Sequence, residues 1–428
     1  MRDDTRNPVD VVIVGAGLAG LNAARTLRRA GRRIVVLEAR GEVGGRTRTR
    51  EIDGRTVDFG GEWIGRAHRR MCALVRELGL HTEPARNIGH PVLWRLPSGN
   101  TCRRLPPPRA LVDIAKVFAC AGRDSRGIDP TAPWAAPDAE RLDARSVADW
   151  LDDRRLGIEG RYLIERLIGS PACQNLDSMS LLQMLWFFRL AGGPLRSANT
   201  TFQWRIAEGA QEISVRIARE LGPESIRLNT PVHRLQQVGG VVVAEAGQLT
   251  VHARHAIVAT PVPQVAHVEF DPPLPTALAE LSQLNVGAGI KVIAGLPSGH
   301  PVKHNTVLGG RFLWGAWRRD DRVTGFVPPM AGAVSDADLM DDLADAFGVK
   351  TRADLRCPTV FRWADERYIG GCDAVFAPGQ VCGFGPLLTR PHGLIHFAGV
   401  GRSSWPDNME GAVRSGERAA RDVLLAVR

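Results

Sequence analysis

A glycine pattern near the start of the chain constrains the fold more than any other feature. Gly15, Gly17 and Gly20 are spaced as G-x-G-x-x-G, after the apolar run VVIV and before LNAARTLRRA, which reads as a helix. The first glycine permits a tight turn, the second lets a pyrophosphate approach the backbone, and the third lets helix and strand pack closely. Residues 34–37 read as the next buried strand and lead to Glu38, where an acid can bind ribose hydroxyls. The pattern predicts a Rossmann-like α/β unit that binds a dinucleotide, and a tight turn without a ligand is the alternative.

Further glycine-rich turns extend this expected site. Gly45 and Arg46, in GEVGGRTRT, can bring backbone amides and a guanidinium to a second face of the pyrophosphate. Another strand then leads to the turn GGEWIG, which contains Gly61. Near the other end of the chain, a strand ends at Gly399 and Met409 opens a final helix.

Together these motifs make the chain resemble the flavin-dependent amine oxidase family, which includes monoamine, polyamine and L-amino-acid oxidases. Simple nicotinamide dehydrogenases lack the second Gly-Gly-Arg element, so the resemblance implies FAD as the cofactor. It also implies the α/β amine oxidase fold, in which a Rossmann-like FAD-binding domain stands beside an α+β substrate domain. In the family the final helix points its N-terminus at the flavin ring, where backbone N–H groups stabilise negative charge.

Both domains are expected to be discontinuous. The FAD-binding domain is predicted to comprise residues 1–85, 203–270 and 391–428, and the substrate-binding domain residues 86–202 and 271–390. The resemblance implies that Val232 lies near the adenine. The apolar stretch MSLLQMLWFFRL is too short for a membrane span and predicts a core helix, with a wall of the substrate cavity as the alternative.

Two charged residues are the candidate catalytic groups. Lys291 interrupts the strand-like run NVGAGIKVIAGL, where burying a lysine without a partner is unfavourable. In the family a lysine at the matching position holds a water molecule against flavin N5; an edge-strand lysine that reaches solvent is the alternative. Glu62 is a candidate acid or base, whose pKa we expect Trp63 to raise by desolvation. A carboxylate paired with an arginine such as Arg66 is the alternative.

The segment FRWADERYIGGCDAVFAPGQ resembles the flavin-edge loop of the family. Trp363 matches an aromatic residue that flanks the ring. Cys372 matches the cysteine that monoamine oxidases join to the flavin 8α-methyl group, and a thiolate can form such a thioether in a polarised site. The resemblance therefore implies a covalent link between FAD and Cys372, with a small buried thiol at the ring edge as the alternative.

The expected substrate pocket departs from the family pattern. Monoamine oxidases frame the amine with two tyrosines, whereas this chain has Asp373 and Asn408 at those places. Trp63 and Trp405 remain as candidate pocket aromatics. Gly401 stands where relatives carry a glutamate that contacts the ribityl chain of the cofactor. These changes favour a polar or charged substrate over a simple arylalkylamine.

Composition limits the partners of the chain. The net charge of +9 reflects 55 Lys and Arg against 46 Asp and Glu, but the arginines are dispersed and accompany no nucleic-acid motif. The seven cysteines have no CxxC spacing, which argues against a disulfide framework or a metal site. No apolar run reaches the roughly 20 residues of a membrane span, and MRDDTRNP lacks an apolar signal core. We therefore expect a cytoplasmic protein from a GC-rich bacterial genome, with no nucleic-acid or membrane partner; a homodimer stays open.

The resemblance implies an oxidase. FAD would take a hydride from a carbon next to nitrogen in a small amine or amino-acid-like substrate, giving an imine, and O2 would reoxidise the flavin and yield hydrogen peroxide. One alternative is a tailoring enzyme of secondary metabolism that oxidises an amide or amine to drive desaturation or cyclisation. An NAD(P)H-dependent reductase or a flavin-dependent isomerase is another, although the sequence shows no second nicotinamide fingerprint.

Overall fold

The computed structural model of the chain describes residues 8–85, 91–172, 174–287, 289–328, 334–406 and 408–427.

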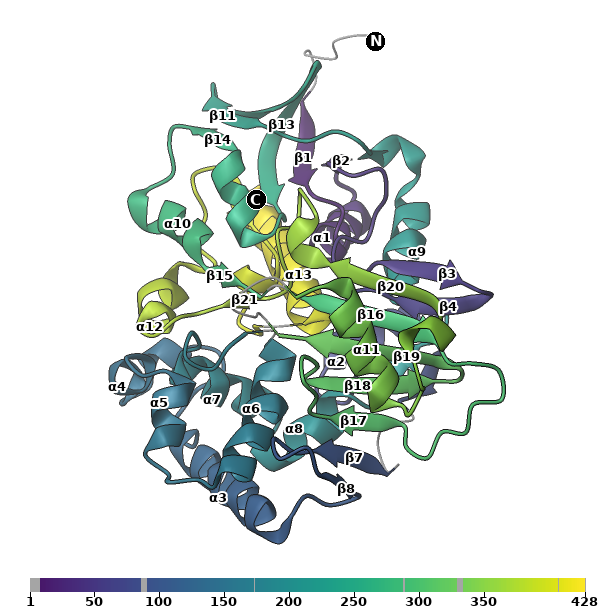
Figure 1. Ribbon diagram of the computed structural model, residues 1–428. Coiled ribbons are helices and arrows are strands. Elements are labelled where there is room, and N and C mark those ends of the chain that lie inside the picture. The colour runs from purple at the N-terminus through teal and green to yellow at the C-terminus, as the bar shows by residue number, and fades with distance from the viewer. Residues whose placement is uncertain are drawn as a thin grey trace.

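The first large sheet, in the upper part of Figure 1, has the order β10-β2-β1-β13-β12-β11-β14, with β22 paired to the second half of β13. The strands β10, β2, β1, β13 and β22 run parallel, whereas β12 is antiparallel to β13. The strands of this sheet are β1 (Val9–Val14), β2 (Ile34–Leu37), β10 (Ile226–Arg227), β11 (Arg234–Val238), β12 (Val241–Ala246), β13 (Leu249–Val258), β14 (Glu269–Asp271) and β22 (Ile395–Phe397).

The alternation of side chains along β1 explains why the sheet has a hydrophobic core on each of its faces. Because strand side chains point to opposite faces in turn, Val11 and Ile13 pack against one layer and Val12 and Val14 against the other. Three helices cover the first face: α1 (Leu18–Arg29), α9 (Gln211–Leu221) and α13 (Met409–Ala426). The predicted order of strand, glycine turn, helix and second strand is therefore confirmed.

The first and last long helices pack directly together. A Cβ atom at Gly416 of α13 would lie 2.2 Å from the carbonyl oxygen of Ala19 in α1, so only glycine permits this approach. The Asn22 side chain of α1 also donates to the Val413 carbonyl of α13 at 3.0 Å. In Figure 1 the yellow α13 accordingly passes through the centre of the molecule beside the purple α1, which joins the two ends of the chain in one core.

The second large sheet has the order β20-β16-β19-β18-β17-β7-β8. Its strands are β7 (Val92–Arg95), β8 (Thr101–Arg103), β16 (Ile290–Gly295), β17 (Thr306–Leu308), β18 (Gly315–Arg319), β19 (Arg322–Val327) and β20 (Arg356–Arg362). Helix α11 (Asp336–Ala346) covers one face, where Val292 and Ala294 of β16 join its core. Ile293 packs against Val57 and Phe59 on the opposite side, so the alternation of β16 turns Lys291 toward these residues as well.

Three small sheets connect the two large ones. They are formed by β3 (Thr49–Ile52) with β4 (Arg55–Asp58), by β5 (Trp63–Ile64) with β9 (Trp204–Ile206) and β6 (Thr82–Pro84), and by β15 (Asn285–Val286) with β21 (Ala374–Val375). Helix α2 (Arg69–Glu77) follows β5 and packs against α13. The loop between β4 and β5 carries the predicted GGEWIG turn.

Helices form a separate core in the lower left of Figure 1. They are α3 (Pro108–Asp124), α4 (Ala139–Asp143), α5 (Val147–Asp152), α6 (Ile158–Ala172), α7 (Leu181–Leu190) and α8 (Pro194–Thr201), with α10 (Thr276–Glu280) and α12 (Gln380–Phe384) nearby. The apolar stretch that predicted a core helix is α7, most of whose residues are buried, so this prediction is confirmed. Within the described ranges, no helix combines the length and apolar character needed to cross a membrane.

Candidate active site

The glycine turn after β1 forms an open cradle. The Gly15 N–H donates to the Leu37 carbonyl at 2.8 Å and ties the ends of β1 and β2 together, with Gly15 at a φ of 103°. Gly17 pairs with Gly44, which brings the second glycine-rich element beside the first. A Cβ atom at Gly17 would meet only the Cα of Gly45, at 3.9 Å, so the space above Gly17 is open to a ligand. An open glycine turn between a strand and a helix lets a pyrophosphate approach the backbone.

The third glycine has a packing function instead. A Cβ atom at Gly20 would lie 1.9 Å from the carbonyl oxygen of Gly15, so α1 can approach β1 only with glycine there. The sequence predicted a tight turn at Gly15, a pyrophosphate contact at Gly17 and close packing at Gly20. The structure agrees for the turn at Gly15 and the close packing at Gly20, and it leaves Gly17 free to face a ligand.

Glu38 lies at the end of β2, as predicted for a residue that binds ribose. Its carboxylate accepts the Ala16 N–H at 2.6 Å and the Arg40 N–H at 2.9 Å, which fixes its position beside the cradle. Burial raises the pKa of Glu38, an effect that these two N–H groups oppose. Val232 packs against the core on the other face of the same sheet. The open cradle and the fixed acid fit the phosphates and a ribose of a dinucleotide.

Several predicted site residues converge on the Gly60–Gly61 turn. A Cβ atom at Gly60 would lie 2.9 Å from the Trp363 ring, and one at Gly61 would lie 3.2 Å from Met409 Cγ. The Lys291 ammonium donates to the Gly60 carbonyl at 2.9 Å. The structure therefore brings together motifs that lie more than 200 residues apart in the sequence.

Lys291 is buried and fully engaged, with an exposed fraction of 6%. Its Nζ donates to the carbonyl oxygens of Asp58 and Gly60, each at 2.9 Å, and to Glu62 Oε2 at 3.1 Å. A buried ammonium is stable only with such partners. The alternative of an edge-strand lysine that reaches solvent is therefore wrong, since β16 lies between β19 and β20.

Glu62 departs from the sequence prediction. Burial alone would raise its pKa, but the charges of Arg205 and Lys291 outweigh burial, and the pKa is lowered from the ordinary value. Arg205 Nε lies 2.7 Å from Glu62 Oε1, and the Trp317 indole donates to the same oxygen at 3.3 Å. The expected raised pKa was wrong because two cations surround the carboxylate. The alternative of a carboxylate paired with an arginine is therefore confirmed, with Arg205 as the partner in place of the example Arg66.

Asp58 is a buried carboxyl group that the sequence did not indicate as a site residue. It accepts the Thr49 hydroxyl at 2.5 Å and the Ala210 N–H at 3.0 Å. Burial, and then the negative charge of Glu62, raise its pKa to about 6. Arg205 and Asp58 both come from short strands whose neighbours are apolar, and an isolated charge between apolar residues was the only available signal.

The flavin-edge loop is held by Trp363 and Arg46. The Trp363 indole donates to the Phe59 carbonyl at 2.9 Å, and Arg46 Nη1 donates to the Cys372 carbonyl. Arg46 also lies 3.8 Å from Asp373 Oδ1, and the Cys372 thiol is 3.7 Å from Asp373 Oδ2. Burial raises the pKa of Asp373, an effect that Arg46 opposes. The predicted flavin-edge residues Trp363, Cys372 and Asp373 are thus close in space. The Arg46 guanidinium, which the sequence placed at the pyrophosphate, instead meets Cys372 and Asp373 of this loop.

The predicted pocket residues fall into two groups. Trp63 makes edge contacts with Trp317 and Phe202, at ring separations of 5.6 and 6.2 Å, and so joins the surroundings of Glu62. Trp405 is buried near α13 and makes its ring contact with His68, at 6.1 Å.

Asn408 and Gly401 each have a local structural role at the positions where the chain departs from the family pattern. The side-chain oxygen of Asn408 accepts the Glu410 N–H at 2.9 Å and caps α13, with Asn408 at a φ of 106°. A Cβ atom at Gly401 would lie 2.5 Å from a methyl group of Val262, so no larger side chain fits in this conformation. Gly399 has a φ of 123°, which suits the glycine at the end of β22.

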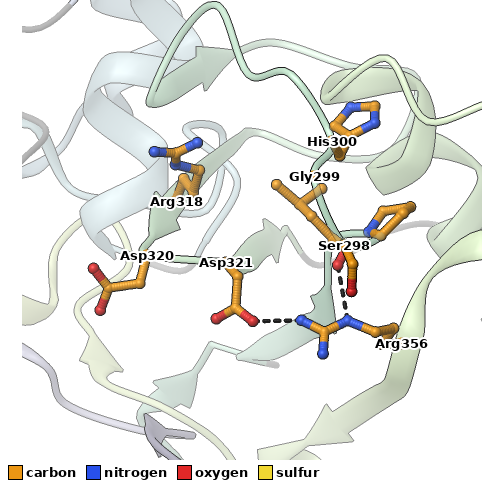
Figure 2. A pocket seen from close by; sticks show the side chains of 9 residues that line it. Ser298, Gly299, His300, Arg318, Asp320, Asp321 and Arg356 are labelled. Atoms are coloured by element: carbon orange, nitrogen blue, oxygen red, sulfur yellow. Dashed lines mark hydrogen bonds and ion pairs between the residues drawn. The ribbon is translucent and has the colours of Figure 1, made fainter.

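A cavity of about 350 Å³ lies elsewhere, at the turn between β18 and β19 (Figure 2). Within it, Arg356 forms an ion pair with Asp321 and also donates to the Leu296 carbonyl at 2.9 Å. Its lining contains no predicted site residue and consists of Leu296, Pro297, Ser298, Gly299, His300, Arg318, Asp320, Asp321 and Arg356.

Comparison with known proteins agrees with this geometry. Residues 18–424 match the family described as flavin containing amine oxidoreductase. The chain is 32% identical to the flavin-containing monoamine oxidase named AofH of Mycobacterium tuberculosis, over 97% of this chain and 96% of the relative. It is 29% identical to amine oxidase B of Sus scrofa, over 98% of this chain and 86% of the relative.

Solved structures give the same result. A putrescine oxidase with bound putrescine superposes with a TM-score of 0.88 at 28% identity, over 97% of this chain and 99% of that chain. Cyclohexylamine oxidase from Brevibacterium oxydans IH-35A has a TM-score of 0.88 at 27% identity, over 98% and 100%. These similarities do not favour the tailoring or reductase alternatives. The chain belongs to the flavin containing amine oxidoreductase family and has its α/β amine oxidase fold, its FAD cofactor and its oxidation of amines at a carbon–nitrogen bond.

Proposed function

We propose that this chain oxidises small aliphatic amines at a reaction centre beside the Gly60–Gly61 turn. The observation that carries the proposal is the burial of Lys291, an ammonium held by two carbonyls and one carboxylate next to that turn. Trp363 and Met409 approach the same turn. Buried charged groups with specific partners concentrate at functional sites.

The cofactor would lie along the residues that fit a dinucleotide. We propose that Gly15, Gly17 and Gly45 bind the pyrophosphate, that Glu38 binds a ribose, and that Val232 lies near the adenine. The flavin end would then reach Arg46, Gly61, Trp363, Cys372, Gly399 and Met409. FAD supplies the hydride acceptor, and O2 is the final electron acceptor.

The protein groups position a proton and exclude water. Lys291 would hold a proton at Nζ next to the Gly60–Gly61 turn, and it would orient a water molecule by exchanging one of its three protein acceptors for that water. Glu62 would fix the Lys291 ammonium, and Arg205 would keep Glu62 ionised through their 2.7 Å ion pair. Trp63 and Trp317 cover this group and keep solvent away from it.

The substrate class follows from the replaced tyrosines. We propose that Asp373 and Trp405 contribute to the pocket and that Asn408 shapes it through the start of α13. A carboxyl group in place of a tyrosine suits a substrate that carries a second ammonium group. The similarity to putrescine oxidase and cyclohexylamine oxidase supports an aliphatic amine.

Anaerobic mixing tests this function. The yellow protein is combined with putrescine, cyclohexylamine, benzylamine and leucine, and loss of the flavin absorbance is followed for each. We expect the aliphatic amines to bleach the flavin fastest. Reduction by leucine alone, or by none of the four, would contradict the proposal.

An Asp373→Asn variant tests the polar wall. We expect its KM for putrescine to rise about tenfold, as for one lost charge-assisted hydrogen bond, and its KM for cyclohexylamine to change little. Asp365→Asn removes an exposed carboxylate from the same segment and serves as the matched control. The domain boundaries, a covalent bond through Cys372, a homodimer, a cytoplasmic location and a link to secondary metabolism stay predictions.

A further inference from the structure

Arg402 is a buried cation with no anionic partner in the described part of the chain. It has an exposed fraction of 1%, and its Nε, Nη1 and Nη2 atoms are all buried without a hydrogen-bond partner among the described residues. The guanidinium lies over the ring of Phe397, 4.5 Å from its centroid. Such a contact does not replace hydrogen bonds for three nitrogen atoms, and a buried unpaired charge is strongly unfavourable.

The surroundings increase the need for an anion. Arg418 lies next to this residue and donates to the carbonyls of Phe397 and Arg402, at 2.6 and 3.2 Å. Asp422 is 3.1 Å from Arg418 and can balance only one of the two guanidinium groups. Burial and the charge of Arg418 lower the pKa of Arg402 to about 10, so it stays protonated at neutral pH. Within the ranges that the structure describes, one positive charge is therefore left without a negative partner.

The position of Arg402 in the fold identifies a source of the missing charge. It ends the short 3-10 helix η8 (Val400–Arg402), directly after β22. Because β22, β13 and β1 are parallel neighbours, their carboxyl ends lie on the same edge of the sheet as the glycine cradle. Ligands of open α/β sheets bind at this edge.

Contacts along the edge are continuous. A Cβ atom at Gly15 would lie 3.2 Å from the Ala259 carbonyl, and one at Gly399 would lie 3.5 Å from the Thr260 carbonyl. The Thr260 hydroxyl is also buried without a partner among the described residues. Two side chains with unsatisfied buried polar atoms thus come from the loops that follow β13 and β22 at this edge.

We propose that Arg402, assisted by the Thr260 hydroxyl, binds the pyrophosphate of FAD. The guanidinium fork matches two phosphate oxygens, and the phosphate supplies the charge that Asp422 cannot. Arg402 is the only arginine, lysine, aspartate or glutamate between Ile395 and Trp405. Gly401 before it carries no side chain, so Arg402 is the one charged residue of η8 that can contact the cofactor. This chain would therefore anchor its cofactor from the C-terminal loop as well as from the first glycine turn.

The test measures FAD binding and the stability of the flavin-free protein. All variants also carry Cys372→Ser, so that retained flavin reports non-covalent binding only. We expect Arg402→Gln to raise the dissociation constant of FAD on the order of 10- to 100-fold, the loss expected for a charge-assisted contact. Arg402→Lys should fall between Gln and wild type, because it keeps the charge without the fork. Arg421→Gln removes an exposed arginine from α13 and should leave the constant unchanged.

Stability separates a binding role from a structural one. If Arg402 has no anionic partner in the flavin-free protein, the flavin-free Arg402→Gln variant should melt at the same temperature as its parent or above it. A lower melting temperature with unchanged FAD affinity would show a structural residue and overturn the proposal.

If the Arg402 variants do not fold, the melting temperature of the protein that keeps Arg402 still tests the proposal. Inorganic pyrophosphate should raise the melting temperature of the flavin-free protein more than chloride at equal ionic strength. An equal effect of the two salts would overturn the proposal. In a folded Arg402→Gln protein the advantage of pyrophosphate should disappear, and its persistence would locate the anion site elsewhere.

Discussion

Lys291 Nζ and Glu62 Oε2 lie 3.1 Å apart in the protein interior, where the two residues expose only 6% and 7% of their surface. The other oxygen of Glu62 pairs with Arg205, which is itself 1% exposed. The three charges form a row that connects β16, the loop after β4, and β9. Glu62 therefore positions the ammonium, and Arg205 in turn holds the carboxylate ionised.

Replacing Lys291 by methionine should slow flavin reduction or its reoxidation by oxygen at least about tenfold, the size expected for a positioned proton-handling group. The methionine fits the volume of the lysine stem, but the Asp58 and Gly60 carbonyls lose their donor. We therefore expect the free energy of unfolding to fall by about 1–3 kcal/mol. Stopped-flow absorbance measures the two half-reactions separately, and urea unfolding measures the stability.

The matched control is Lys303→Met, which removes an exposed lysine from the same sheet region. It should change neither half-reaction. Unchanged rates in Lys291→Met, together with the loss of stability, would assign Lys291 a structural role and remove it from the reaction centre.

The pH dependence of stability should report on Asp58. Its pKa is about 6 in the folded protein and 3.8 ordinarily, so between these values the folded state keeps a proton that the unfolded state has lost. The contribution of Asp58 to the free energy of unfolding therefore falls as the pH rises through this window, by about 3 kcal/mol in total. Asp58→Asn should gain stability relative to wild type from pH 4 to pH 7. Urea unfolding at several pH values checks this, and parallel pH profiles for the two proteins would contradict it.

The sequence was sufficient for the parts of the fold that follow local rules. Gly15, Gly17 and Gly20 lie within one strand–turn–helix unit, and the apolar runs around them alternate or repeat with the period of their element. The cofactor cradle, the strand of Lys291 and the start of α13 at Met409 could therefore be predicted.

The charge pattern around Glu62 could not be predicted in the same way. Arg205 lies 143 positions further along the chain and reaches Glu62 because β9 pairs with β5. No local rule connects these strands, so the sequence offered only neighbours of Glu62 in the chain, Trp63 as a source of desolvation and Arg66 as a partner. The pairing of strands that lie far apart in the sequence determines which cation forms an ion pair with a buried acid. This pairing is a property of the tertiary structure and cannot be read from neighbouring residues.

Two alanine substitutions in the glycine turn should separate binding from folding. Gly20→Ala places a Cβ atom 1.9 Å from the Gly15 carbonyl oxygen, and this overpacking should destabilise the protein by about 3 kcal/mol. Gly17→Ala meets no atom closer than 3.9 Å and has an ordinary φ of −75°, so the fold should keep its stability. Its methyl group enters the space of the pyrophosphate, and we expect the FAD dissociation constant to rise at least about tenfold. Thermal unfolding and FAD titration measure the two effects, and equal FAD affinity for Gly17→Ala and wild type would contradict this use of the cradle.

A covalent bond from Cys372 to the flavin should survive acid denaturation. The thiol lies next to the carboxyl group of Asp373, and Arg46 stands 3.8 Å from that carboxyl group and donates to the Cys372 carbonyl. The guanidinium offsets the carboxylate, so we expect the yellow colour to remain with the acid-precipitated protein. Mass spectrometry should find a peptide spanning residues 370–376 that is heavier by one flavin adduct. Cys372→Ser should release the flavin into the supernatant and still bind it before denaturation, because the glycine cradle is unchanged. Complete release of flavin from the wild-type protein would refute the bond and leave the amine oxidase assignment intact.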